Sequence, residues 1–117
     1  MPRAAPPVFF AIVFPVLLAA SGCAVLRDDA NALLARGRPV EALEALRQEE
    51  RSARRGSRCD FVRYALDRGV VHLALGDPAE GTVWVVRADQ GAAAAPACLD
   101  AENRGKLASA KRSLLSP

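Results

Sequence analysis

The sequence predicts an all-α domain of about five helices, built as two tandem helix–turn–helix units and a C-terminal capping helix. From Ala30 onward, apolar residues recur at intervals of three and four, which is the period of an amphipathic helix. The alternation typical of strands is absent except in the short run 83–86. A Gly-x-Pro motif at residues 37–39 occurs again at 76–78, which indicates a repeated turn.

We expect helices over residues 26–36, 39–54, 58–75, 78–90 and 98–114. Gly37 and Gly76 suit the left-handed backbone conformation that ends a helix. Pro39 and Pro78 suit the first helical turn, where no backbone N–H is needed. The sequence therefore places a turn of the same design before the second helix and before the fourth.

Local signals set the remaining boundaries. Ser57 and Asp60 have the spacing of a capping box, which predicts the start of the third helix. The run 83–86 fits a strand or a helix by its periodicity, but Pro78 and Glu80 just before it favour a helix. We interpret the alanine-rich stretch 91–96 as the connector before the last helix.

The two units repeat in sequence. Residues 35–42 and 74–81 share Ala, Gly, Pro and Glu at a constant offset of 39 residues, and the start of the last helix echoes residues 65–69. Units of this kind resemble the tetratricopeptide repeat over about residues 26–114. The residues that carry the resemblance are Ala42, Leu46, Gly69, Gly76, Asp77, Gly81, Val85 and Ala88. Arg68 and Glu49 depart from that pattern, and a generic pair of helical hairpins is the alternative.

The N-terminal residues carry a targeting signal. Arg3 precedes an apolar run over residues 8–19, and the run ends in Ala20-Ser21-Gly22-Cys23. This segment resembles the signal peptide and lipobox of bacterial lipoproteins, which implies cleavage before Cys23 and acylation of its thiol and amino group. An uncleaved anchor and an ordinary secretory cleavage are the alternatives. The expected organisation is a signal peptide over 1–22, a lipidated tether over 23–29 and a helical domain over 30–117.

The resemblance also implies a location. Acylated Cys23 would hold the protein in membrane lipid at the bacterial envelope, facing the periplasm. Ala24 rather than Asp after that cysteine is the pattern that enterobacterial sorting sends to the outer membrane.

Size and charge limit the functions that fit. Removal of residues 1–22 leaves 95 of the 117 residues, which suffices for one small domain without a deep cleft. The same removal lowers the formal net charge from +3 to +2, a balance that argues against nucleic acid as a partner. No Ser/His/Asp set and no phosphate-binding glycine loop is present, so we expect no enzyme, no cofactor and no small-molecule substrate.

Two further cysteines predict a disulfide. Cys59 and Cys98 are separated by the repeat offset of 39 residues, and each is expected at the start of a first helix of its unit. Such helices are parallel neighbours in stacked units, which brings the two thiols together in an oxidising compartment. A redox pair is the alternative, although no Cys-x-x-Cys spacing supports it. Free thiols are the other alternative.

The candidate partner-binding residues form two groups. Arg54, Arg55 and Arg58 belong to the densest charge cluster, which predicts either a solvated turn or contact with anionic headgroups or an acidic partner. Arg68, His72 and Trp84 are the second group, and their convergence on one groove would favour a binding protein. Trp84 is expected in the core, and His72 has no Cys or His at metal-ligand spacing on its face.

These observations predict a lipid-anchored, non-catalytic adaptor that binds an envelope protein through the concave surface of a short helical stack. One alternative is an escort of secretin subunits, because the protein resembles pilotins in size, anchor and helicity. The other is a purely structural envelope lipoprotein.

Overall fold

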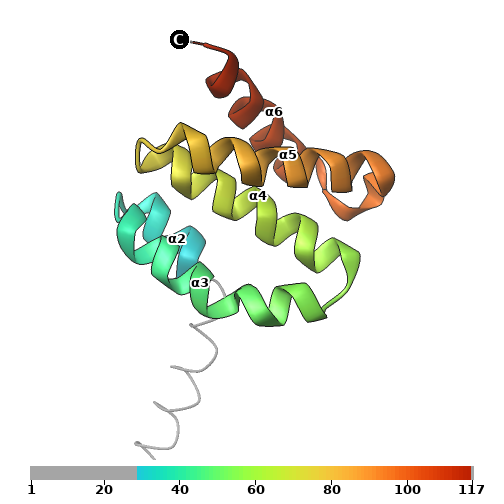
Figure 1. Ribbon diagram of the computed structural model, residues 1–117, viewed down its shortest axis with the longest axis horizontal. Coiled ribbons are helices and arrows are strands. Elements are labelled where there is room, and N and C mark those ends of the chain that lie inside the picture. The colour runs from blue at the N-terminus through green and yellow to red at the C-terminus, as the bar shows by residue number, and fades with distance from the viewer. Residues whose placement is uncertain (1–28, 117) are drawn as a thin grey trace, which may run out of the picture.

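The computed structural model describes residues 29–116, and all of its regular structure is helical. The elements are α2 (Asp29–Ala35), α3 (Pro39–Arg55), α4 (Arg58–Ala74), α5 (Pro78–Ala94), the 3₁₀ turn η2 (Pro96–Cys98) and α6 (Ala101–Leu115). Figure 1 shows α4 running between α3 and α5, and consecutive helices form the antiparallel pairs α2/α3 and α4/α5. The predicted all-α class with five helices is confirmed. The predicted signal peptide, Cys23 and most of the tether lie outside the described residues.

The turns before α3 and α5 have the same design, as predicted. Gly37 and Gly76 have φ angles of 75° and 74°, in the left-handed region that favours glycine. In both turns the N–H after the glycine donates to the carbonyl five residues earlier, at 2.9 Å. Pro39 and Pro78 then open the next helix. Each turn therefore satisfies the end of one helix and reverses the chain into the next.

Carboxylate and hydroxyl caps fix the starts of three helices. The predicted capping box is present at α4, where Ser57 Oγ accepts from the Asp60 N–H at 3.1 Å and Asp60 Oδ2 accepts from the Ser57 N–H at 3.0 Å. Asp77 caps α5, and Asp100 caps α6. These bonds satisfy backbone donors that have no partner within the helix.

The core centres on the crossing of α4 and α5. Its fully buried side chains include Leu46 of α3, Leu66 of α4 and Val85 of α5. The helices approach most closely at Gly69, where a Cβ atom would lie 2.7 Å from Val85 Cγ2 and 3.1 Å from the Val85 backbone nitrogen. A side chain at position 69 would therefore force the two helices apart.

Two predicted boundaries are wrong. The fourth helix continues to Ala94 instead of ending at residue 90, because the alanines that follow are strong helix formers. Within that extension Gly91 packs so closely on Val62 that a Cβ would lie 2.5 Å from its Cγ2. The last helix begins at Ala101 instead of residue 98, because Leu99 is extended and Asp100 supplies the cap.

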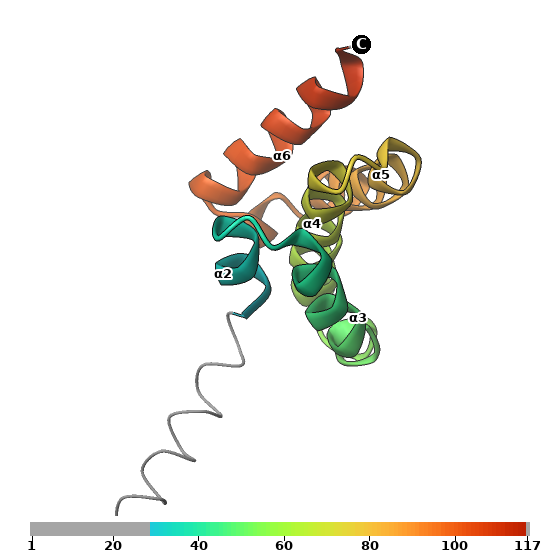
Figure 2. The same cartoon turned by 90° about the vertical axis from the view of Figure 1, so that its left-hand side faces the viewer.

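Helix α6 ends the stack, and Figure 2 shows it diverging from the other helices. Its buried residues are Leu107 and Ala110, and much of its surface is small or polar. This composition agrees with the capping role expected from the sequence. Within residues 29–116, no helix has the length and apolar character needed to cross a membrane.

Candidate partner-binding surface

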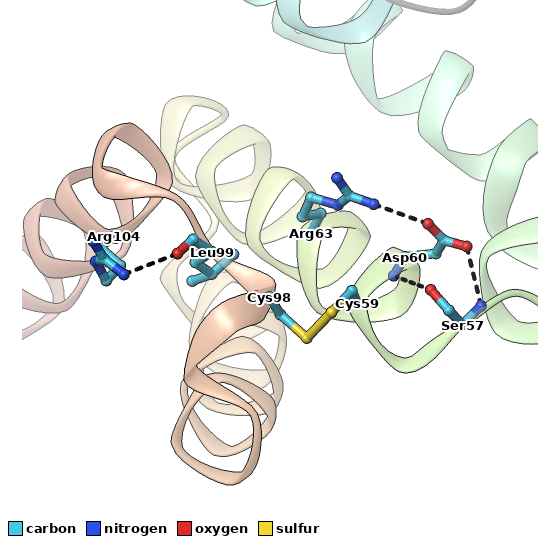
Figure 3. Close-up of a disulfide and its surroundings, with 7 residues drawn as sticks. All are labelled: Ser57, Cys59, Asp60, Arg63, Cys98, Leu99 and Arg104. Carbon is cyan, nitrogen blue, oxygen red and sulfur yellow. Dashed lines mark hydrogen bonds and ion pairs between the residues drawn. A yellow bond between two sulfur atoms is a disulfide. The ribbon is translucent and has the colours of Figure 1, made fainter.

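A disulfide ties the start of α4 to the segment before α6. Cys59 and Cys98 are bonded, with their Cα atoms 4.7 Å apart, and Figure 3 shows the bond beside the capping box of α4. The predicted disulfide is therefore present. Its second cysteine lies in η2 rather than in the last helix, because that helix begins three residues later than expected.

Three aromatic side chains gather on the side of α4 that faces α5. The Tyr64 and Trp84 rings meet edge to face with their centroids 5.7 Å apart, and Phe61 lies 6.4 Å from each of them. Trp84 and Tyr64 are both 4% exposed, whereas Phe61 is only partly buried. Trp84 is thus a core residue, as expected, and Phe61 is the aromatic side chain that reaches the surface.

Arginines from three helices surround this aromatic group. The guanidinium carbons of Arg68 and Arg87 lie 4.5 and 4.6 Å from the centroid of the Trp84 ring. The guanidinium carbon of Arg54 lies 5.5 Å from the Phe61 centroid and 5.9 Å from that of Trp84. Such cation–π contacts hold charged groups at an apolar surface. We call Arg54, Arg68, Arg87, Phe61 and Trp84 the arginine–aromatic cluster.

Glu50 of α3 connects two arginines of the cluster. Its carboxylate accepts from Arg68 Nη1 at 2.6 Å and from Arg54 Nε at 2.9 Å. Hydrogen bonds from Arg54 and then from Arg68 lower the pKa of Glu50. Arg68 also donates to the Tyr64 hydroxyl at 3.0 Å, while burial raises the pKa of Tyr64. One carboxylate against three guanidiniums leaves the cluster positively charged.

His72 lies one helical turn beyond Arg68 and is 4% exposed. Its Nδ1 is 3.7 Å from Asp77 Oδ2, and neither ring nitrogen has a hydrogen-bond partner among the described residues. Burial, followed by the charge of Arg68, lowers the pKa of His72. Of the second predicted group, Arg68 and Trp84 therefore meet in the cluster, while His72 is buried apart from it.

The exposed part of the surface is a shallow groove between the start of α4 and the end of α5. Its lining residues are Arg58, Phe61, Val62, Arg87, Gln90, Gly91 and Ala94. Arg58 and Arg87 are exposed on either side of an apolar floor, and Arg54 approaches that floor at Phe61. Of the predicted arginines, Arg54 and Arg58 border this region, while Arg55 lies exposed at the end of α3.

Sequence reasoning did not assign a site role to Glu50, Phe61 or Arg87. The spacing of Phe61 with Tyr64 and Arg68 places all three on one face of a helix, and this signal was available. Glu50 and Arg54 have the spacing of an intrahelical ion pair. The approach of Glu50 to Arg68 depends on how α3 packs against α4, which local spacing does not reveal.

No family model, no curated protein and no solved structure matches this chain. Among residues 29–116, no group of three or more His, Cys, Asp or Glu side chains is arranged to hold a metal ion.

Proposed function

We propose that this protein is a lipid-anchored, non-catalytic adaptor of the bacterial envelope, and that it binds a protein partner through the groove between α4 and α5. The groove combines an apolar floor at Phe61 with the exposed guanidiniums of Arg58 and Arg87. Arginine and aromatic side chains are enriched at the centres of protein interfaces. This pairing is the observation that carries the proposal, and it favours a partner segment with carboxylates beside an apolar side chain.

Two observations support an envelope location. The segment ending in Cys23 has the features of a lipoprotein signal, and the Cys59–Cys98 disulfide suits an oxidising compartment. Acyl chains on Cys23 would hold the domain at the membrane, and a weak contact with a neighbouring membrane protein then gains from its high local concentration.

The helical architecture supports a scaffold rather than an enzyme. The turns at Gly37 and Gly76 share one geometry, and Gly69 allows the close helix crossing found in tetratricopeptide-like units. We therefore propose that the two hairpins are a short repeat stack whose polar last helix caps it. The proposed contact is the groove between the paired helices α4 and α5, in place of the concave surface expected from the sequence.

Crosslinking in intact cells tests the proposal. The photoreactive residue p-benzoylphenylalanine replaces Gln90, an exposed residue of the groove, or Arg112, an exposed residue of α6, as the control. We expect one dominant envelope protein crosslinked from position 90 and not from position 112. Mass spectrometry of the purified full-length protein should find Cys23 triacylated.

The opposite results have clear meanings. An unmodified Cys23 would contradict the lipid anchor. A triacylated protein without a specific crosslink from position 90 would contradict the adaptor and favour a purely structural lipoprotein.

A further inference from the structure

The outer side of α3 carries a row of arginines that the adaptor groove does not use. Arg47, Arg51 and Arg55 are spaced by four residues, so they share one side of the helix and span about 12 Å along its axis. All three are exposed. Ala42 and Leu46, which are buried, mark the opposite side of α3. We call these three residues the arginine row.

The part of the chain that the structure describes supplies no ion-pair partner for the row. Within residues 29–116, none of its three guanidiniums makes an ion pair, whereas the neighbouring Arg54 is held by Glu50. Together with Arg54 and Glu50, the row lines a shallow hollow on α3. Three exposed guanidiniums in one line thus face solvent beside a concave surface, which is an arrangement that suits anionic groups.

The chain enters the domain beside α3, on a different side of that helix from the row. Asn31 in the first turn of α2 lines one groove with Glu49 and Ser52, so α2 begins beside the middle of α3. Fully extended, the six residues from Ala24 to Asp29 span about 20 Å. A lipid on Cys23 would therefore hold the start of α2 within about 20 Å of the membrane surface. Rotation of the domain about this tether can then bring the row within about 8–10 Å of the headgroups, the range of electrostatic attraction at physiological salt.

The arrangement of α3 and α6 bears on how the domain would be oriented at a membrane. Figures 1 and 2 are related by a turn about the vertical, and in both of them α3 is the lowest helix while α6 extends upward. A membrane placed below the molecule in these views would meet α3 before α4, α5 or α6. The C-terminal end of α6 would then point away from the membrane.

We infer that the arginine row docks on anionic lipid headgroups and fixes the orientation of the anchored domain. The inference rests on the proposed acylation of Cys23. Acyl chains alone leave a domain free to rotate about its tether, and a basic surface supplies the second attachment. Docking through α3 leaves the groove between α4 and α5 open to a protein partner.

A fluorophore on the outer side of α3 tests this orientation. The full-length lipidated protein is reconstituted in vesicles of phosphatidylcholine, or of phosphatidylcholine with about one third phosphatidylglycerol. An environment-sensitive dye is attached at Gln48→Cys, beside the row, or at Ser113→Cys on α6. We expect a blue shift from position 48 on anionic vesicles alone, no shift from position 113, and loss of the shift in about 1 M salt, where screening shortens the interaction range to about 3 Å.

Charge reversal supplies the matched comparison. Each arginine held near an anionic surface favours docking about fivefold, so reversing Arg47, Arg51 and Arg55 together to Glu should lower the docking equilibrium constant by at least about a hundredfold. Arg112→Glu, an exposed change on α6, should leave the docking equilibrium unchanged.

One outcome is that Cys23 is shown to be lipidated while the dye at position 48 has the same emission maximum on both vesicle types. That result would overturn the docking of the row and leave the lipid anchor standing. That result is also expected if the row binds an acidic protein instead of lipid. An unmodified Cys23 would overturn both the anchor and the docking. An equal effect of Arg112→Glu would show that the attraction is not specific to the row.

Discussion

Arg68 has only 11% of its side chain exposed, and its charge is held there by Glu50, Tyr64 and the face of Trp84. A buried guanidinium is costly unless hydrogen bonds replace the water that it loses. Arg68 Nε nevertheless has no partner among the described residues, so the side chain is only partly satisfied. Arg68 is thus the residue that joins α3, α4 and α5.

His72 makes the stability of the fold depend on pH. Its pKa is lowered from the ordinary value of 6.5, first by burial and then by Arg68, and these effects outweigh the opposing charges of Asp77 and Glu80. The unfolded chain therefore takes up a proton near pH 6.5, whereas the folded protein takes it up at a lower pH. The free energy of unfolding should fall as the pH drops below about 6.5, with a slope of at most about 1.4 kcal/mol per pH unit.

Urea unfolding at pH 7.5 and pH 5.0 measures this loss, and His72→Gln should remove most of it. The pKa values of Glu50 and Asp60 are lowered, so both carboxylates stay ionised over this range and do not account for the slope. A wild-type protein that is more stable at pH 5.0 would show that attraction to Asp77 outweighs the burial of His72.

At the scale of the helices, the close crossing of α4 and α5 limits which residues position 69 can hold. We expect Gly69→Ala to destabilise the protein by about 1–3 kcal/mol, because the added Cβ meets both the side chain and the backbone of Val85. Gly105→Ala is the matched control, since that helical glycine has nothing within 4 Å of an added Cβ. This change should stabilise by up to about 1 kcal/mol through helix propensity. Thermal unfolding of both variants measures the contrast, and equal effects would contradict the close crossing.

The helix boundaries show which features of the fold could be predicted from local sequence and which could not. Gly37, Gly76 and the capping box at Ser57 were predictable because their chemistry acts within a few residues. The continuation of α5 past Gly91 was not, because a glycine among alanines resembles a linker until its contact with Val62 is known. The same limit applies to the site. Its arginines were visible as charges, but the meeting of Glu50 with Arg68 depends on tertiary packing.

At the scale of the whole molecule, one covalent bond supplements a small core. Closing a loop of 39 residues by a disulfide stabilises a fold by about 3–4 kcal/mol. The net stability of a fold this small is itself only about 3–5 kcal/mol, so the bond accounts for most of it. We therefore expect the double change Cys59→Ala and Cys98→Ala to leave the domain largely unfolded at 37 °C, as measured by circular dichroism. Chemical reduction of the natural protein should have the same effect, and a melting temperature within a few degrees of the natural one would contradict the prediction.

The same bond also determines how the molecule would carry a mechanical load. Between a lipid tether before α2 and a pull applied at α6, the covalent path runs through α3 to Cys59 and crosses directly to Cys98. The α4–α5 hairpin lies in the closed ring between the two cysteines, so tension along the chain bypasses it. The backbone between the two cysteines, which carries Phe61, Trp84 and most of the groove, would not be stretched by a force that unravels α2 and α3.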